Sequence, residues 1–201
     1  MTTAGPGTAR PGGRTARIRA AVRAATLAEL SERGYAGFTV EGVAARSGVH
    51  KTTLYRRWTG TDGLIADALD LAAGEAWPVP DTGTLDGDLH ALAGLVLAGF
   101  TDPDAGPVAR AFVQAAAQSP AAARALRAFF ARRHEQSAAL VARAIERGEA
   151  PAGTDPAEVV RLAIAPLYYR LFVSGEPIDG AAAARAAAAA CAAARAGLLV
   201  T

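Results

Sequence analysis

The chain has 201 residues, of which 51% are hydrophobic, so it can bury one generous core or a small unit beside a larger one. Its single cysteine excludes an internal disulfide and favours a reducing compartment. The sequence shows no signal-peptide pattern, and no window approaches the roughly 20 apolar residues that a membrane span requires. We therefore expect a cytoplasmic protein with no membrane partner.

Charge is divided unevenly along the chain. Residues 1–60 carry ten Lys and Arg residues against three Glu residues, a net charge of +7. Residues 61–201 carry eleven cations against sixteen anions, a net charge of −5. An arginine-rich coding bias explains the shortage of lysine but not the change of sign, so we expect the N-terminal end to meet a polyanion.

The first part of the chain is expected to contain a disordered, mildly basic arm over residues 1–14, which are rich in Gly and Thr. A helix is predicted over 15–33, because apolar residues such as Ile18 and Val22 recur along one side at near-helical spacing. Gly34 follows the last basic residue of this helix, which is typical of a helix C-cap.

Three shorter helices are predicted next. Thr39 is a suitable N-cap for a helix that ends near Arg46. Gly48 then breaks the chain before a second helix over 51–58, and a third helix begins at Thr61.

Five further helices are predicted after a proline-containing loop. Their expected ranges are 86–100, 105–117, 120–147, 156–174 and 179–198. Pro120 and Pro156 each stand at the first helical position after a capping residue, whereas Pro166 is expected to kink the helix that contains it. No sustained period-2 pattern is present, so we predict an all-α fold with a small basic head and a larger helical body.

The stretch SGVHKTTLYRRW, residues 47–58, combines hydroxyls, rings and cations and includes the chain's only lysine. It does not fit a phosphate-binding loop, because the required glycines would fall at Ala45 and His50 and no strand precedes them. It does not fit a catalytic pair either. His50 and Lys51 would point about 100° apart on a helix, and no nearby carboxylate or nucleophile completes a site.

The same stretch fits a helix-turn-helix unit. Gly48 allows a tight turn between two short helices, and Leu54 and Trp58 can pack against the helix at 15–33. The remaining side chains supply hydrogen-bond donors to phosphate oxygens or base edges of DNA. These outward residues are Lys51, Thr52, Thr53, Tyr55, Arg56 and Arg57.

Residues 15–61 closely resemble the DNA-binding head of the TetR/AcrR (tetracycline-repressor) family. The resemblance is carried by GY after the first helix, TV at the second, V-A-x-x-S-G-V across the turn and T-L-Y-R-R-W on the recognition helix. It implies that the outward residues face DNA and that Thr39 meets a phosphate. Two candidate DNA contacts depart from the family pattern, since His50 replaces a frequent serine cap and Thr61 replaces a frequent lysine.

The resemblance also implies that residues 62–201 form a ligand-binding and dimerisation domain that takes a small-molecule effector of unknown identity. Aromatic residues on packed helices belong to a core more often than to a pocket, so both interpretations stay open here. The candidate ligand-binding residues are Trp77, Phe100, Phe112, Gln114, Phe130, His134, Tyr168 and Tyr169.

The last two predicted helices are, by the same resemblance, the expected homodimer interface. The final helix is rich in alanine, which permits close backbone approach but buries little area per residue, so a solvated helix is the alternative. The candidate interface residues are Leu162, Leu171, Ile178, Cys191 and Leu198. Neither His90 nor His134 makes a recognised metal spacing, so no metal or other cofactor is predicted.

The sequence thus predicts a ligand-responsive, homodimeric repressor that binds a palindromic double-stranded DNA operator and is released by a small apolar or amphipathic effector. Two alternatives remain open. One is a helix-turn-helix dimer without an effector pocket. The other is an enzyme with a helical body, against which the lack of a convergent catalytic constellation counts.

Overall fold

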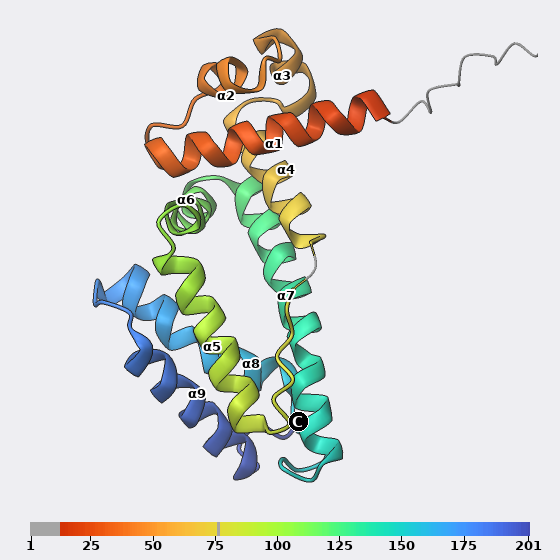
Figure 1. Cartoon of the computed structure of the whole chain (residues 1–201), viewed down its shortest axis with the longest axis vertical. Helices are drawn as coiled ribbons and strands as arrows, with labels where there is room; N and C mark the ends of the chain where they lie inside the picture. Colours follow the sequence, from red (N-terminus) through yellow and green to blue (C-terminus); the bar gives the residue numbers. More distant parts are fainter. Residues whose placement is uncertain (1–12, 76) are drawn as a thin grey trace, which may run out of the picture.

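The computed structural model describes residues 13–75 and 77–201. Within these ranges the chain is mostly helical, which confirms the predicted all-α class, and the only β-type pairing is one bridge between Thr154 and Val200. The elements are α1 (Gly13–Arg33), α2 (Val40–Ser47), α3 (Lys51–Trp58), α4 (Thr61–Ala73), α5 (Leu85–Thr101), α6 (Ala105–Gln118), α7 (Pro120–Glu146), α8 (Pro156–Tyr169), the π-helical turn η1 (Arg170–Ser174) and α9 (Gly180–Arg195) (Figure 1).

The helix boundaries follow the predicted ranges closely in the first two thirds of the chain and less closely after that. Residues 1–12 of the predicted arm lie outside the described residues, and Gly13 already begins α1. The single kinked helix predicted over 156–174 is instead α8 followed by η1, a widened turn that begins four residues after Pro166. The last predicted helix ends early, at Arg195.

Side-chain caps explain where many of these helices begin. The Thr39 hydroxyl accepts the amide hydrogen of Gly42 at 3.0 Å, as expected for an N-cap. Ser119 caps α7 and Asp155 caps α8, each directly before a proline whose missing N–H would have had no partner there. The starts of the helices are therefore fixed by local sequence.

The head consists of α1 with α2 and α3 packed on one side of it (Figure 1). Its core contains Leu30, Val43 and Leu54, all fully buried, together with the Trp58 indole. The same cluster includes Leu64 and the other buried apolar residues of the first turns of α4. The helix that leaves the head is therefore packed into the core of the head.

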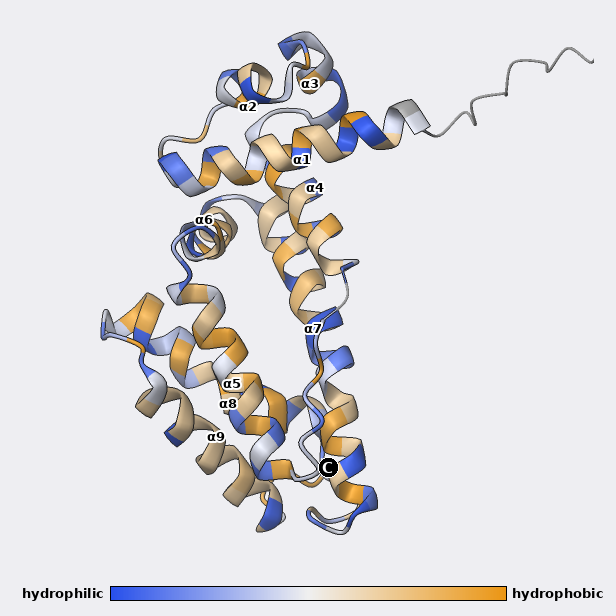
Figure 2. Cartoon of the chain, in the orientation of Figure 1, coloured by the Kyte–Doolittle hydropathy of each residue, from blue (hydrophilic) through white to orange (hydrophobic). Residues whose placement is uncertain are grey.

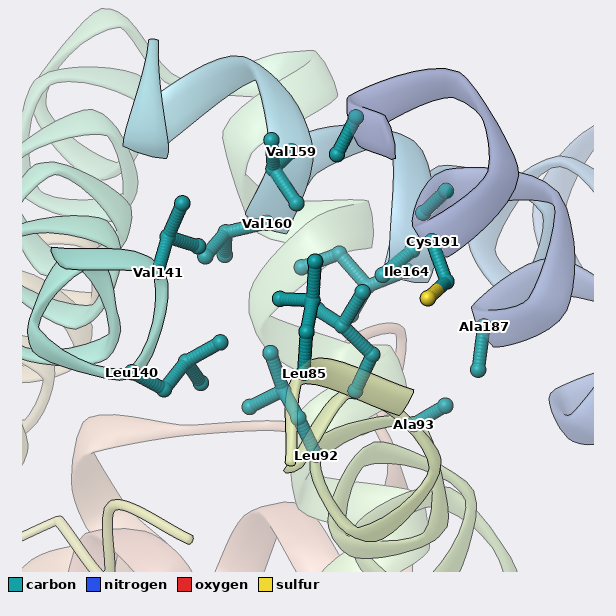
Figure 3. Packing of buried hydrophobic residues seen from close by; sticks show 14 of the residues in the cluster. Leu85, Leu92, Ala93, Leu140, Val141, Val159, Val160, Ile164, Ala187 and Cys191 are labelled. Carbon is teal, nitrogen blue, oxygen red and sulfur yellow. The ribbon is translucent and has the colours of Figure 1, made fainter. Parts of the chain in front are cut away.

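The body is built from α5, α7, α8 and α9, and Figure 3 shows the packing of its buried side chains. Leucine and valine side chains from α5, α7 and α8 meet the small residues of the alanine-rich α9, which is mostly pale orange, or moderately hydrophobic, in Figure 2. Because alanine is small, α9 lies close against α5 and α8, and seven of its residues are buried. The alternative that α9 is a helix surrounded by solvent is thus excluded, because α9 is packed against its own chain.

Candidate nucleic-acid interface and interior cavity

The turn between α2 and α3 depends on one glycine. Gly48 has φ +67° and ψ +9°, a left-handed conformation that is unfavourable for residues with a Cβ, and its N–H donates to the Ala44 carbonyl at 3.0 Å. The next amide, that of Val49, donates to the Ser47 hydroxyl at 3.2 Å. These bonds end α2 and let α3 start within three residues.

Helix α3 has one buried side and one exposed side. Leu54 and Trp58 are 0% and 7% exposed and fix the helix to the head core. Tyr55 is 48% exposed although it is aromatic, so this ring is not needed by the fold of the chain. The other residues of the outward side are Lys51, Thr52, Arg56 and Arg57, which are exposed, and Thr53, which is half-buried.

His50 occupies the N-cap position of α3, in place of the serine that is frequent there in the family that the sequence resembles. Its Nδ1 accepts the amide hydrogen of Thr52 at 3.3 Å. The ring therefore performs the task of a serine hydroxyl and leaves Nε2 free of any bond within the described residues. Thr61, by contrast, is not a cap, because Gly60 holds that position and Thr61 is the first helical residue of α4.

The joint between α3 and α4 is tight. Thr59 follows α3 with φ +54°, an uncommon value for a residue with a branched side chain, and its N–H donates to the Tyr55 carbonyl at 3.1 Å. A Cβ on Gly63, in the first turn of α4, would overlap the carbonyl oxygen of Trp58. The end of α3 and the start of α4 are therefore in direct backbone contact.

A buried carboxylate fixes α2 to α1. Glu29 is fully buried, and its Oε2 accepts from Nε of Arg46 at 2.7 Å, while Arg46 also bonds both carboxylate oxygens of Glu32. The hydrogen bonds from Arg46 lower the pKa of the Glu32 carboxyl. Gly42 leaves the space that the Glu29 side chain fills. This network orients the helix-turn-helix on its supporting helix.

A cavity of about 750 Å³ lies between α1, α4, α5, α6, α7 and α8. This volume lies within the roughly 300–1,000 Å³ range of small-molecule sites, and most of the lining is apolar. Six of the eight candidate ligand residues line it, namely Trp77, Phe100, Phe112, Phe130, His134 and Tyr168. Gln114 and Tyr169 do not, because both side chains are exposed on the outer sides of their helices. We therefore withdraw these two as ligand residues.

The aromatic rings of the cavity pack on one another. Tyr168 makes edge contacts with Phe100 and Phe130, at centroid distances of 5.1 and 5.6 Å. Burial raises the pKa of Tyr168, so its hydroxyl stays protonated. His134 stacks on Phe130, and burial, followed by the charge of Arg161, lowers the pKa of His134. This part of the cavity thus offers rings and a few neutral polar groups to a ligand.

The comparisons with known proteins agree with this arrangement of head and cavity. A family model described as "Tetracyclin repressor-like, C-terminal domain" matches residues 79–190, and one described as "Bacterial regulatory proteins, tetR family" matches residues 22–68. The chain belongs to the TetR family. It is a helix-turn-helix, DNA-binding transcriptional regulator, as the sequence resemblance predicted, and its relatives are regulators rather than enzymes.

Two related transcriptional regulators match about four fifths of the chain. The regulator YdeS of Bacillus subtilis is 30% identical over 162 residues, which cover 79% of this chain and 80% of YdeS. The DNA-binding transcriptional repressor TetR of Mycobacteroides abscessus is 35% identical over 172 residues, 81% and 85% of the two chains. Among solved structures, the TetR family regulator SCO0332 is 30% identical, with a TM-score of 0.66 over 85% of this chain and 97% of SCO0332.

Sequence reasoning missed many lining residues of this TetR-family cavity, among them Arg23 on α1 and, most importantly, Arg133 on α7. Its guanidinium lies over the Trp77 ring at 4.8 Å and the Phe129 ring at 5.0 Å. It donates to the carbonyls of Ala72 and Glu75 at 2.9 and 3.1 Å, at and just beyond the end of α4. The available signal was helical spacing, since a residue three or four positions after Phe129 and Phe130 lies on the same side of α7.

The candidate dimer residues differ in how far their side chains are exposed. Leu162 and Leu198 are 36% and 75% exposed, so they are available to a second chain, and Leu171 and Ile178 are half-buried. Cys191 is only 2% exposed and, as Figure 3 shows, lies among the packed side chains of the body core. Cys191 is therefore a core residue of its own chain, and we withdraw it from the interface.

Within the described ranges, no group of three or more His, Cys, Asp and Glu side chains is arranged to hold a metal ion. His90 pairs with Asp86 at the surface of α5, at 3.5 Å. No helix among the described residues combines the length and the apolar character needed to cross a membrane.

Proposed function

We propose that this TetR-family regulator is a repressor that binds a palindromic operator as a homodimer and is released when a small apolar or amphipathic effector enters the cavity. One observation carries the proposal. The exposed face of α3 and the cavity of about 750 Å³ are joined by a single helix, α4, which begins at the first and lines the second.

The geometry of α4 supports a mechanical coupling between the two sites. At its start, Gly63 packs against the backbone of Trp58, so α4 cannot tilt without moving the end of α3. Along its length, Leu69 and Ala72 line the cavity. A ligand that fits better when α4 is displaced would therefore bias the head toward a position that no longer matches the DNA, and a ligand with equal affinity for both positions would change nothing.

Charge and side-chain chemistry support DNA as the partner of α3. Lys51, Tyr55 and Arg57 present donors at the exposed surface, and the Thr39 hydroxyl is held at the start of α2. We assign these residues to phosphate contacts and Arg56 to base reading in the major groove. The free Nε2 of His50 and the first amides of α4, including that of Thr61, are further phosphate donors.

A second copy of the chain is the proposed partner of α8, η1 and α9. Apolar side chains are exposed on these elements, among them Tyr169 at 59% and Val173 at 69%. A twofold interface through this face would place two α3 helices on one side of the dimer, which suits half-sites about 34 Å apart or somewhat more.

The decisive experiment first identifies the operator and then tests whether small molecules release the protein from it. DNA bound by the full chain is selected from random sequence, and binding to the selected site is measured with a library of apolar compounds present. We expect a palindromic site and compounds that both stabilise the protein against heat and lower operator affinity. Saturable stabilisation without a decrease in operator affinity would contradict the release mechanism. If no compound stabilises the protein, a dimer without an effector is the better description.

A further inference from the structure

Two arginines and one glutamate meet where α4 ends beside the cavity. Arg23 of α1 pairs with the Glu75 carboxylate at 2.5 Å, and Arg133 of α7 donates to the Glu75 carbonyl at 3.1 Å. Arg23 and Arg133 both line the cavity. The one carboxylate at this end therefore faces two guanidinium groups, which leaves an excess of one positive charge. The pKa of Glu75 is lowered by both arginines, with Arg23 the larger cause.

Neither guanidinium is fully bonded. The Nε–H groups of Arg23 and Arg133 are both buried, and neither has a hydrogen-bond partner among the described residues. For Arg133, Nη1 donates to Glu75 and Gln136 and Nη2 to Ala72, so Nε–H and one Nη2–H remain available. Nε–H and an Nη2–H of one guanidinium can together bind a carboxylate with two parallel bonds.

A buried N–H donor without an acceptor is unfavourable, and the excess positive charge lies on two side chains that are only partly exposed. The acidic residues elsewhere in the lining do not supply the missing charge. Glu32 is bonded to Arg46 on the outer side of α1, and Asp104 lies near Ser31, two helical turns along α1 from Arg23. The rest of the lining near Arg133 is aromatic, with Trp77 and Phe129 against the guanidinium.

We propose that the effector is a monocarboxylate with an apolar body, whose carboxylate binds between Arg23 and Arg133 while its body fills the aromatic part of the cavity. This inference rests on the proposed effector function and specifies its chemistry. The carboxylate satisfies the free N–H groups and balances the excess charge, and the rings of Phe130 and Tyr168 accept the apolar body.

The same binding event acts on α4. The bonds from Arg133 to the main-chain carbonyls of Ala72 and Glu75 have one ionised partner, whereas a bidentate pair with a carboxylate has two, so the ligand attracts the guanidinium toward itself. As the guanidinium shifts toward the ligand, its bonds to the C-terminal end of α4 lengthen and weaken. Arg133 is therefore a positioning residue for α4 as well as a ligand-binding residue, and an acid differs from a neutral molecule of the same shape in its power to release DNA.

The test uses matched pairs of compounds that differ only in charge: decanoic, 2-naphthoic and biphenyl-4-carboxylic acids, each with its methyl ester. Dissociation constants for the full chain are measured by calorimetry, and operator affinity is measured in the presence of each compound. We expect at least one acid to bind at least tenfold more tightly than its ester, and that acid alone to lower operator affinity.

Three variants locate the effect. Arg133→Met keeps the length of the side chain without its charge and is expected to reduce the acid preference to less than twofold while ester binding persists. Arg23→Met, which leaves the bonds between α7 and α4 in place, is expected to weaken acid binding separately. Arg132→Met changes the neighbouring exposed arginine of α7 and is expected to behave like the wild type. Ester binding reports that the cavity of each variant is still folded.

The outcomes distinguish the carboxylate inference from the effector function on which it rests. Equal affinity for acids and esters, or an acid preference that survives in both Arg133→Met and Arg23→Met, would overturn the carboxylate inference and leave the effector function standing. If no acid or ester binds the wild-type chain, both the inference and the proposed effector function fail for ligands of this kind.

Discussion

His50 shows how one residue can serve both the fold and a proposed contact with DNA. Its Nδ1 accepts the Thr52 amide hydrogen and so begins α3, while Nε2 remains available to the outside. A neutral imidazole that accepts at Nδ1 carries its proton at Nε2, the nitrogen that can donate to a phosphate. Addition of a second proton would remove the cap. The two roles therefore agree in the neutral ring and oppose each other in the charged one.

Lys51 is expected to contribute to DNA affinity without contributing to sequence preference. The Lys51→Ala change removes one cation from the exposed start of α3, so the slope of log K against log salt concentration is expected to become shallower by about 0.9 for each phosphate that Lys51 neutralises. Operator and random DNA are expected to weaken alike in fluorescence anisotropy titrations. Arg132→Ala on α7 is the control, and an unchanged slope for Lys51→Ala would remove this residue from the phosphate contacts.

His134 is expected to make stability depend on pH. Burial lowers its pKa in the folded chain, so the folded state resists the proton that the unfolded chain takes up as the pH falls through about 6.5. Stability is thus expected to decrease from pH 7.5 to 5.5. The decrease, measured by urea unfolding, is expected to be smaller in His134→Gln than in the wild type. Equal pH dependence in His134→Gln and the wild type would contradict the prediction.

At the scale of elements, α4 is distinguished by contacts at both of its ends. Its first turn touches the backbone of α3, and the Ala72 carbonyl near its end accepts from Arg133. Arg19 of α1 adds a pairing with Asp67 at 2.6 Å on the outer side of α4. Other elements thus hold this helix along its whole length in the described state, and it can change position only if those contacts change.

The Gly63→Ala change is expected to separate α3 from α4. The added methyl group would overlap the Trp58 carbonyl, so the helices must move apart, with a decrease of about 1–3 kcal/mol in the free energy of unfolding and a loss of operator binding. The control is Gly94→Ala in α5, where the new Cβ meets no atom within 4 Å. This change is expected to stabilise the chain by about 0.5–1 kcal/mol. Both free energies are to be measured by chemical denaturation. Wild-type operator affinity in Gly63→Ala would contradict the proposed close contact between α3 and α4.

The sequence predicted the head better than the body because the signals of the head are local. Thr39, Gly48 and the pair Leu54 and Trp58 each act within a few residues of their own positions. The cavity depends on residues brought together from six helices, and spacing along one helix did not settle which side faces inward. Phe112 and Gln114 illustrate this limit, since they are two residues apart on α6 and point to opposite sides. Arg133 was missed because its partners lie about 60 residues away in the chain.

At the scale of the whole molecule, the operator must be read by two heads, so dimer formation should control DNA affinity. The Val173→Glu change places a charge on the exposed apolar face beside α8 and is expected to yield monomers in light scattering. These monomers are expected to keep wild-type thermal stability within a few degrees and to lose most operator affinity. Ala139→Glu, at an exposed position on α7, is the control. A dimeric Val173→Glu chain with full operator affinity would place the interface elsewhere.

The exposed position of Lys51 has a practical consequence for chemistry on this protein. Lys51 is the only lysine in the sequence, so it provides the chain's single side-chain primary amine. An amine-directed acylating reagent would therefore attach a fluorophore to the first turn of α3 and to no other side chain. Because that turn lies on the proposed DNA-facing side, bound operator would shield the amine, and the rate of acylation would report operator occupancy without any engineered residue.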